Sequence, residues 1–193
     1  MLDAFPRYLR RLSSQPRSTT YRAWAVVIGI GVFFGLGPPL LGLAGRSVAR
    51  HLPVLLPRAV EIPLGLLLML SGSALLVWSA ATFWRVGHGT PAPVAAPQRL
   101  VVVGPFRHCR NPIELGALCF YFGVGCVFLS FIAGVTMFAI GLILGSTYHR
   151  LFEEKELRLR FGADYERYRQ RTPFLIPRPW RSHEPDQPEQ TPS

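Results

Sequence analysis

Three long runs of residues without a charged side chain constrain the fold of this chain more than any other feature. Counting histidine as neutral, they cover residues 23–45, 62–84 and 115–149. A helix of about 20 apolar residues spans a bilayer core, so each of the first two runs predicts one transmembrane helix. The third run would form a helix about 52 Å long. Because that length exceeds one ordinary span, we expect two helices with a tight turn near residues 130–134. The sequence therefore predicts an all-α, polytopic membrane protein with about four transmembrane helices.

Composition divides the chain into three parts. Residues 1–22 mix aromatic and aliphatic side chains with arginines, which is typical of a basic segment that lies on a membrane surface. We expect one membrane domain over residues 23–181 and a disordered tail over residues 182–193. Within the membrane domain the expected spans are about 23–45, 62–84, 112–128 and 132–150, with the last helix extending to about residue 161.

Glycine and proline mark the expected ends of these helices. Asn111 followed by Pro112 predicts a helix start, with asparagine as the cap and proline at the first helical position. Gly162 favours a helix stop, with a further short helix over residues 163–168. Glycines and prolines between Gly35 and Pro39 predict a kink or an early end of the first helix.

The basic residues predict orientation as well as class. The formal net charge is +10, and arginines gather before the first run, in the 85–111 loop and after the last run. By the positive-inside bias, both termini and the 85–111 loop face the cytoplasm. Arg46, Arg50 and Arg58 lie on the other side and count against this orientation. Because basic residues that flank apolar spans already explain the charge, we expect no nucleic-acid partner.

The three cysteines predict neither a disulfide framework nor a metal site, because their number is odd and their spacing unpaired. Cys119 and Cys126 lie seven residues apart on one face of the expected third span, where we expect them to pack as small apolar side chains. Cys109 lies in the cytoplasmic loop among basic residues, a setting that favours the thiolate.

Polar residues near the membrane gather at two places that the expected hairpin of spans three and four brings together. The residues from Arg107 to Asn111 precede the hairpin, and those from Tyr148 to Glu154 end it. Glu114 adds a carboxylate just inside the membrane, where an ionised group is costly unless it is paired. Either this cluster is a structural set of ion pairs, or it is a pocket for a zwitterionic or charged ligand.

Several motifs along the chain match one known pattern in order. They are Gly87-His88-Gly89-Thr90-Pro91-Ala92-Pro93, Gly104-Pro105-Phe106-Arg107, Arg110-Asn111-Pro112-Ile113-Glu114-Leu115-Gly116, Glu153-Glu154-x-x-Leu157 and Phe161-Gly162-x-x-Tyr165-x-x-Tyr168 with Pro173. Together they resemble the integral-membrane methyltransferases that include isoprenylcysteine carboxyl methyltransferase and phospholipid N-methyltransferases. The resemblance covers about residues 60–178. That family usually has tyrosine where this chain has Glu114.

The resemblance implies that S-adenosyl-L-methionine binds on the cytoplasmic side and that a lipophilic acceptor enters from the bilayer. The cofactor residues that it implies are Arg110, Asn111, Pro112, Gly116, Glu153 and Glu154, and position adds His88, Pro91 and Gly104.

Catalytic candidates are Arg107, His149 and Glu114, because methyl transfer needs alignment, exclusion of water and, for some acceptors, a base. Arg107 or Arg110 would hold an acceptor carboxylate, and His149, His88 or Glu114 would deprotonate a hydroxyl or phenol.

Two other functions stay open at this point. A membrane sterol-type reductase would share the helical architecture but use NADPH, and a non-enzymatic scaffold would use the polar cluster for structure alone. A transporter is less favoured, because the spans contain almost no polar residues besides serine, threonine and Glu114. The sequence leaves open which acceptor is methylated, whether on oxygen, sulfur or nitrogen, and the oligomeric state.

Overall fold

The computed structural model describes residues 18–53 and 55–178, and within these residues it contains helices and no strands. Three helical stretches are long and apolar enough to cross a membrane: Thr19–Ala49, Arg58–Arg85 and Phe131–Arg171. A shorter apolar helix, Pro112–Phe128, packs among them. The prediction of an all-helical polytopic membrane protein is confirmed. The expected surface segment, up to residue 17, and the expected tail lie outside the described residues.

The first stretch passes through the region of glycines and prolines without ending there. It consists of α2 (Thr19–Ile30), a wider π-helical segment η1 (Gly31–Leu36) and α3 (Gly37–Ala49). Of the two expected outcomes, a kink or an early end, the early end does not occur, because the two prolines occupy the first turn of α3, where a backbone N–H is not required. The irregularity is instead the π-helical segment η1. The backbone N–H of Gly37 donates to the carbonyl oxygen of Val32. The carbonyl oxygen of Phe33 instead accepts a hydrogen bond from the Tyr121 hydroxyl, at 2.9 Å.

Glycines bring the next two helices, α4 (Arg58–Arg85) and α5 (Pro112–Phe128), into close contact. A Cβ atom at Gly72 would lie 2.6 Å from the carbonyl oxygen of Gly116, and one at Gly123 would lie 2.4 Å from that of Gly65. Small residues at such positions let two membrane helices pack backbone against backbone. The α4–α5 pair therefore forms the tight centre of the bundle.

The antiparallel hairpin of α5 and α6 (Phe131–Tyr148) turns at Leu129 and Ser130, at the near edge of the expected turn. Side chains from the start of α4 hold this turn. Arg58 donates to the carbonyl oxygens of Cys126 and Val127, at 2.9 and 2.7 Å. Glu61, only 1% exposed, accepts from the backbone N–H of Phe131 and from Arg58, both at 2.9 Å. The pair thus satisfies backbone groups at the end of α5 and the start of α6.

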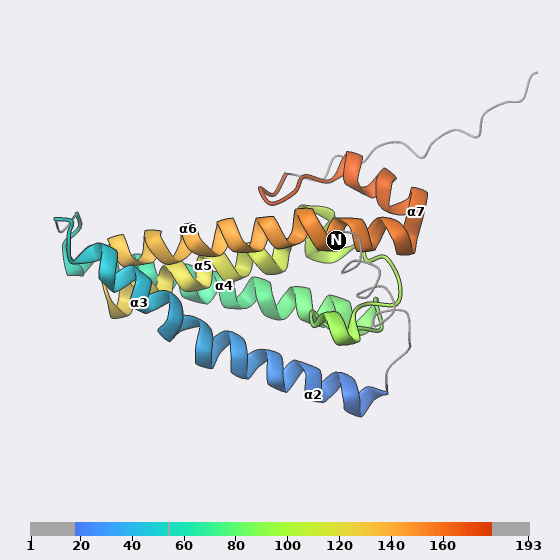
Figure 1. The fold of residues 1–193 in the computed structure, drawn as a ribbon, viewed down its shortest axis with the longest axis horizontal. Coiled ribbons are helices and arrows are strands. Elements are labelled where there is room, and N and C mark those ends of the chain that lie inside the picture. Colours follow the sequence, from blue (N-terminus) through green and yellow to red (C-terminus); the bar gives the residue numbers. More distant parts are fainter. Residues whose placement is uncertain (1–17, 54, 179–193) are drawn as a thin grey trace, which may run out of the picture.

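The last helix continues past the apolar run and then changes direction. After α6 comes a second π-helical segment, η4 (His149–Glu153), and then α7 (Glu154–Arg171), which bends at Gly162. Gly162 has φ 53°, in the left-handed region that glycine adopts readily. As Figure 1 shows, the chain after this bend folds back beside the end of α6.

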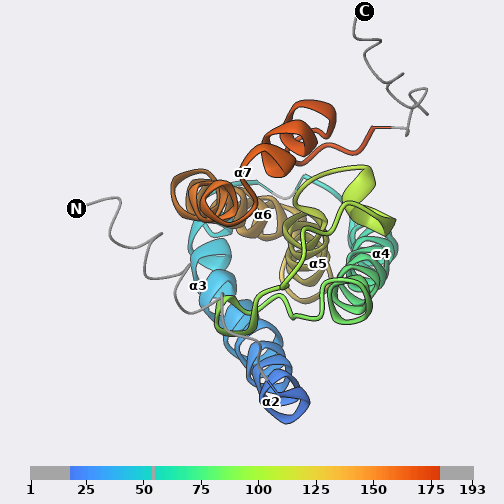
Figure 2. The same cartoon turned by 90° about the vertical axis from the view of Figure 1, so that its right-hand side faces the viewer.

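Seen along the bundle, α4, α5 and α6 form the core, α3 packs against α6, and α2 diverges outward (Figure 2). Arg22 ties the start of α2 to the rest: it donates to the carbonyl oxygens of Trp84 and Gly89 and lies 4.0 Å from the Trp84 ring centroid. Large apolar side chains such as Leu43, Leu67 and Ile143 are exposed along the outer helix faces, as expected for surfaces that meet lipid.

Candidate functional site

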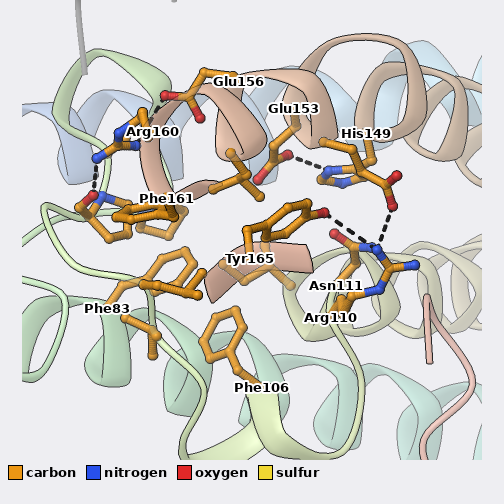
Figure 3. A pocket seen from close by; sticks show the side chains of 18 of the residues that line it. Phe83, Phe106, Arg110, Asn111, His149, Glu153, Glu156, Arg160, Phe161 and Tyr165 are labelled. Atoms are coloured by element: carbon orange, nitrogen blue, oxygen red, sulfur yellow. Dashed lines mark hydrogen bonds and ion pairs between the residues drawn. The ribbon is translucent and has the colours of Figure 1, made fainter. Parts of the chain in front are cut away.

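A cavity of about 320 Å³ lies at the end of the bundle where α4 ends and α5 begins. Its walls come from the loop between these helices, from the start of α5, and from the η4 and α7 segments. Figure 3 shows aromatic side chains at the centre of the cavity and ionic pairs on two sides of it. The volume falls in the range of small-molecule sites.

One ionic pair joins the two segments that the sequence predicts to meet. Arg110, which precedes α5, donates from Nη1 to Glu154 Oε1 at 2.7 Å and to the Tyr165 hydroxyl at 3.4 Å. The side chains of Arg110 and Glu154 are only 12% and 13% exposed. Arg110 Nε is buried and has no hydrogen-bond partner within the described part of the chain. Buried polar groups without a partner are uncommon in folded proteins, so this guanidinium keeps unused hydrogen-bonding capacity next to the cavity.

A second ionic cluster surrounds His149 in the π-helical segment η4. Its Nδ1 contacts Glu153, and its Nε2 lies 3.3 Å from Glu114 Oε2. Glu114 is 6% exposed and accepts a hydrogen bond from Ser146 Oγ at 3.0 Å. Gly145 makes room for it, since a Cβ there would lie 2.7 Å from Glu114 Oε1. The imidazole therefore sits between two carboxylates and can exchange a proton with either side.

Aromatic rings form the centre of the cavity between these ionic groups. Phe83 from α4 stacks on Phe106 with ring centroids 4.4 Å apart, and Phe161 and Tyr165 from α7 face them (Figure 3). Tyr168 donates from its hydroxyl to the carbonyl oxygen of Phe106 at 2.6 Å, which fixes α7 on the loop. Stacked rings offer a flat apolar surface and favourable faces for a cation.

Two further sets of contacts hold the elements around the cavity together. Arg160, on α7, pairs with Glu156 at 3.1 Å and donates to the carbonyl oxygen of Pro97, so it connects the helix to the loop. The extended segment 172–178 lies along the loop on the other side. There the backbone N–H of Arg110 donates to Pro173 O at 2.9 Å, and Asn111 Nδ2 donates to Phe174 O at 3.0 Å.

Asn111 therefore does not cap α5 with its side chain, as the sequence had led us to expect. The helix begins at Pro112 as predicted, but it has no side-chain cap. The side-chain amide of Asn111 instead donates to the carbonyl oxygen of Phe174, in the segment after α7. That segment is distant in the chain, so the sequence around Asn111 does not reveal this contact.

The structure brings most of the predicted site residues to this cavity. Those that line it are Pro91, Arg110, Asn111, Pro112, Glu114, His149, Glu153 and Glu154. The others do not line it: His88, Gly104, Arg107 and Gly116.

The four residues outside the cavity have other positions in the fold. His88 and Arg107 are exposed. Gly104 has φ 62° and lies against Thr82. A Cβ at Gly116 would lie 2.9 Å from Gly72 O, so this glycine serves the packing of α4 and α5.

The sequence did not predict the aromatic rings at the centre of the cavity or Arg160, which connects α7 to the loop. Phe106, Phe161, Tyr165 and Tyr168 stand inside the quoted motifs, so their presence there was the available signal. Phe83 and Arg160 carried no comparable signal, because only the fold brings them to the cavity.

The thiol of Cys109 is not the reactive group that its basic neighbours suggested. Cys109 is 1% exposed, and burial raises its pKa from 9.0 to about 11. A buried thiol stays protonated because its thiolate loses solvation. The structure therefore corrects the expected thiolate to a neutral packing residue.

The fold and the cavity together define a polytopic helical membrane protein with a polar and aromatic cavity at one end of the bundle. Comparison with known families makes this specific: a family model described as phospholipid methyltransferase matches residues 60–164. The chain belongs to the phospholipid methyltransferase family, and it is a membrane methyltransferase. The matched residues include α4, the loop, α5, α6 and the first part of α7, which together build most of the cavity. Searches of curated proteins and of solved structures give no significant match.

Proposed function

We propose that this protein transfers a methyl group from S-adenosyl-L-methionine to a lipophilic acceptor that resides in the membrane, in the manner of isoprenylcysteine carboxyl methyltransferase. The observation that carries the proposal is the buried Arg110–Glu154 pair in the wall of a cavity of small-molecule size. The membership of the methyltransferase family supports it.

The residues of the cavity fit this cofactor by their chemistry. S-adenosylmethionine carries a carboxylate, an ammonium, ribose hydroxyls, an adenine ring and a sulfonium whose methyl group is electrophilic. Arg110, in the cavity wall, would attract the carboxylate through its guanidinium charge. Glu153 and Glu154 provide acceptors for the ammonium or the hydroxyls. The rings of Phe83, Phe106 and Tyr165 supply faces for the adenine and the sulfonium.

His149 and Glu114 are the candidates for proton transfer. Glu114 lies at the membrane end of the cavity wall, in the first turn of α5, and His149 connects it to Glu153. These two residues would take a proton from an acceptor that must lose one. Arg107 is exposed and outside the cavity, so it has no part in this proposal.

We also propose that the cavity faces the cytoplasm, as the arginines around the 85–111 loop favour. The acceptor would then come from the cytoplasmic leaflet. A lipid amine and a prenylated cysteine carboxylate are the two acceptor classes to compare, and radiolabelled methyl transfer to each in proteoliposomes separates them.

Calorimetric titration of the detergent-solubilised protein with S-adenosylmethionine tests the cofactor. The wild type should bind saturably at one site, and the Glu153→Gln/Glu154→Gln double variant should lose most of this binding because the acidic wall is removed. Asp164→Asn is the matched control, since this carboxylate is exposed on α7 and pairs only with Arg167 in the described part of the chain. It should bind like the wild type.

Two results would overturn the proposal. The first is a folded wild type that does not bind S-adenosylmethionine, and NADPH binding in that sample would favour the reductase instead. The second is equal affinity in the double variant and in Asp164→Asn, which would place the cofactor elsewhere.

A further inference from the structure

An apolar groove of about 620 Å³ lies at the other end of the bundle, among α3, α4, α5 and α6. Its lining includes Phe34, Met69, Phe120, Val124 and Met137, and among the described residues Arg46 is the one charged side chain in it. It shares no lining residue with the cavity of the candidate site. The helix α5 passes between the two, from Pro112 at the cavity to Phe128 at the groove, a distance of about 25 Å.

The break in the first helix shapes this groove. The π-helical segment η1 and the two prolines that follow it stand along the groove at Phe34, Pro38 and Pro39. Figure 2 shows α2 leading outward from this point while α3 stays against α6. A π-helical turn is uncommon and is found preferentially at functional positions. The fold thus opens an apolar channel toward the lipid instead of filling it with protein.

Arg58 and Arg46, both at this end of the bundle, differ in whether their guanidinium groups are paired. Arg58 is engaged by Glu61 and by carbonyl oxygens of the α5–α6 turn, so it has a structural role. Arg46, in the last turn of α3, is exposed, and within residues 18–53 and 55–178 its guanidinium has no ion pair or hydrogen bond. It lies on the groove, whereas Arg50, one turn further, does not.

We infer that this groove binds one anionic phospholipid of the leaflet opposite the cavity, with its phosphate on Arg46 and an acyl chain along Phe34, Phe120 and Met137. A hydrocarbon chain matches the apolar lining, and a phosphate matches the guanidinium, for which it is a preferred partner. A phospholipid carries both parts. A zwitterionic headgroup would also bring a cation close to Arg46, so an anionic headgroup is favoured. The site also gives a reason for an arginine on the face where the positive-inside bias does not favour one.

Native mass spectrometry of the intact protein, titrated with phosphatidylglycerol or phosphatidylcholine, tests the inference. The wild type should bind one phosphatidylglycerol about tenfold more tightly than phosphatidylcholine. Arg46→Gln should lose this preference. Arg50→Gln removes the same charge from an exposed position outside the groove and should keep the preference.

A second variant tests the groove without changing its charge. Gly42 lines the groove, and a Cβ there would make only an ordinary contact with Leu129, at 3.6 Å. The Gly42→Leu variant should fold, and its leucine side chain should fill part of the groove. Phosphatidylglycerol binding should then weaken at least tenfold although Arg46 is still present. Equal lipid binding by wild type, Arg46→Gln and Gly42→Leu would overturn the inference. A wild-type dimer that becomes a monomer in the Gly42→Leu variant would also overturn it, because the groove would then hold a second copy of the chain.

Discussion

Arg110 Nη1 and Glu154 Oε1 lie 2.7 Å apart, although 44 residues separate them along the chain. The contact joins a residue two positions before α5 to the first residue of α7. The α5–α6 hairpin makes it possible, because an antiparallel pair of helices returns the chain to the membrane face from which it started. The pair is therefore a point at which the fold and the candidate site depend on one another.

Replacing Arg110 by lysine should weaken S-adenosylmethionine binding at least tenfold. Lysine keeps the charge but cannot present a fork of N–H groups to Glu154, Tyr165 and a ligand together. Isothermal titration calorimetry measures the loss. Arg167→Lys is the control, since Arg167 and its partner Asp164 are both 68% exposed, and this variant should bind normally. Unchanged affinity in Arg110→Lys would argue that Arg110 serves only the structure.

Gly72→Val should destabilise the α4–α5 contact by about 2 kcal/mol or more. A Cβ at this position would lie 2.6 Å from both the carbonyl oxygen of Gly116 and the backbone nitrogen of Phe120. Backbone atoms cannot move aside as a flexible side chain can. Thermal unfolding in detergent, followed by circular dichroism, measures the effect. Gly29→Val is the control, because nothing lies within 4 Å of a Cβ at Gly29, and equal unfolding temperatures for the two variants would contradict the packing described above.

Arg58→Gln should destabilise the protein by roughly 2 kcal/mol, because it leaves the buried Glu61 carboxylate without its cation and frees the carbonyl oxygens at the end of α5. Adding Glu61→Gln to this variant should restore part of the loss, since the neutral amide oxygen still accepts from Phe131 N–H. Denaturant unfolding of both single variants and the double variant gives the coupling. Additive effects would show that the two side chains act independently.

Cys109 should react with iodoacetamide about a hundredfold more slowly in the folded protein than in the unfolded chain at pH 8. The thiolate is the reacting form, and burial raises the pKa of this thiol from 9.0 to about 11. The neutral thiol favours the folded state below pH 9, and this contribution is lost as the pH rises toward 11. A Cys119→Ala/Cys126→Ala variant isolates the measurement. Fast labelling of this folded variant near pH 8 would contradict the burial of Cys109.

The helix starts, the hairpin and the meeting of its two ends could be predicted from local patterns. Pro112 begins α5, the charge-free run after Glu114 divides into α5 and α6, and Gly162 bends α7. Proline, glycine and charge act on their own neighbourhood in the chain, so their effects are readable there. Local reasoning was only half sufficient at Gly35–Pro39: it pointed to an irregularity, which is η1, but it could not exclude an early helix end, because the Tyr121 hydroxyl that donates to the carbonyl oxygen of Phe33 comes from α5.

What the sequence by itself determined is the membrane class, the helical architecture and the polar segments that meet at one end of the bundle. These follow from the hydrophobic effect and from the cost of leaving backbone groups unpaired in lipid, both of which depend on residue type and order. Only the tertiary structure decided which of those polar residues share the cavity. Phe83 and Arg160 enter it because α4 ends and α7 begins beside it. Gly116 is turned away because α4 packs against it, and Cys109 is neutral because the loop buries it. Burial and neighbourhood depend on segments far apart in the chain, and the fold alone places these side by side.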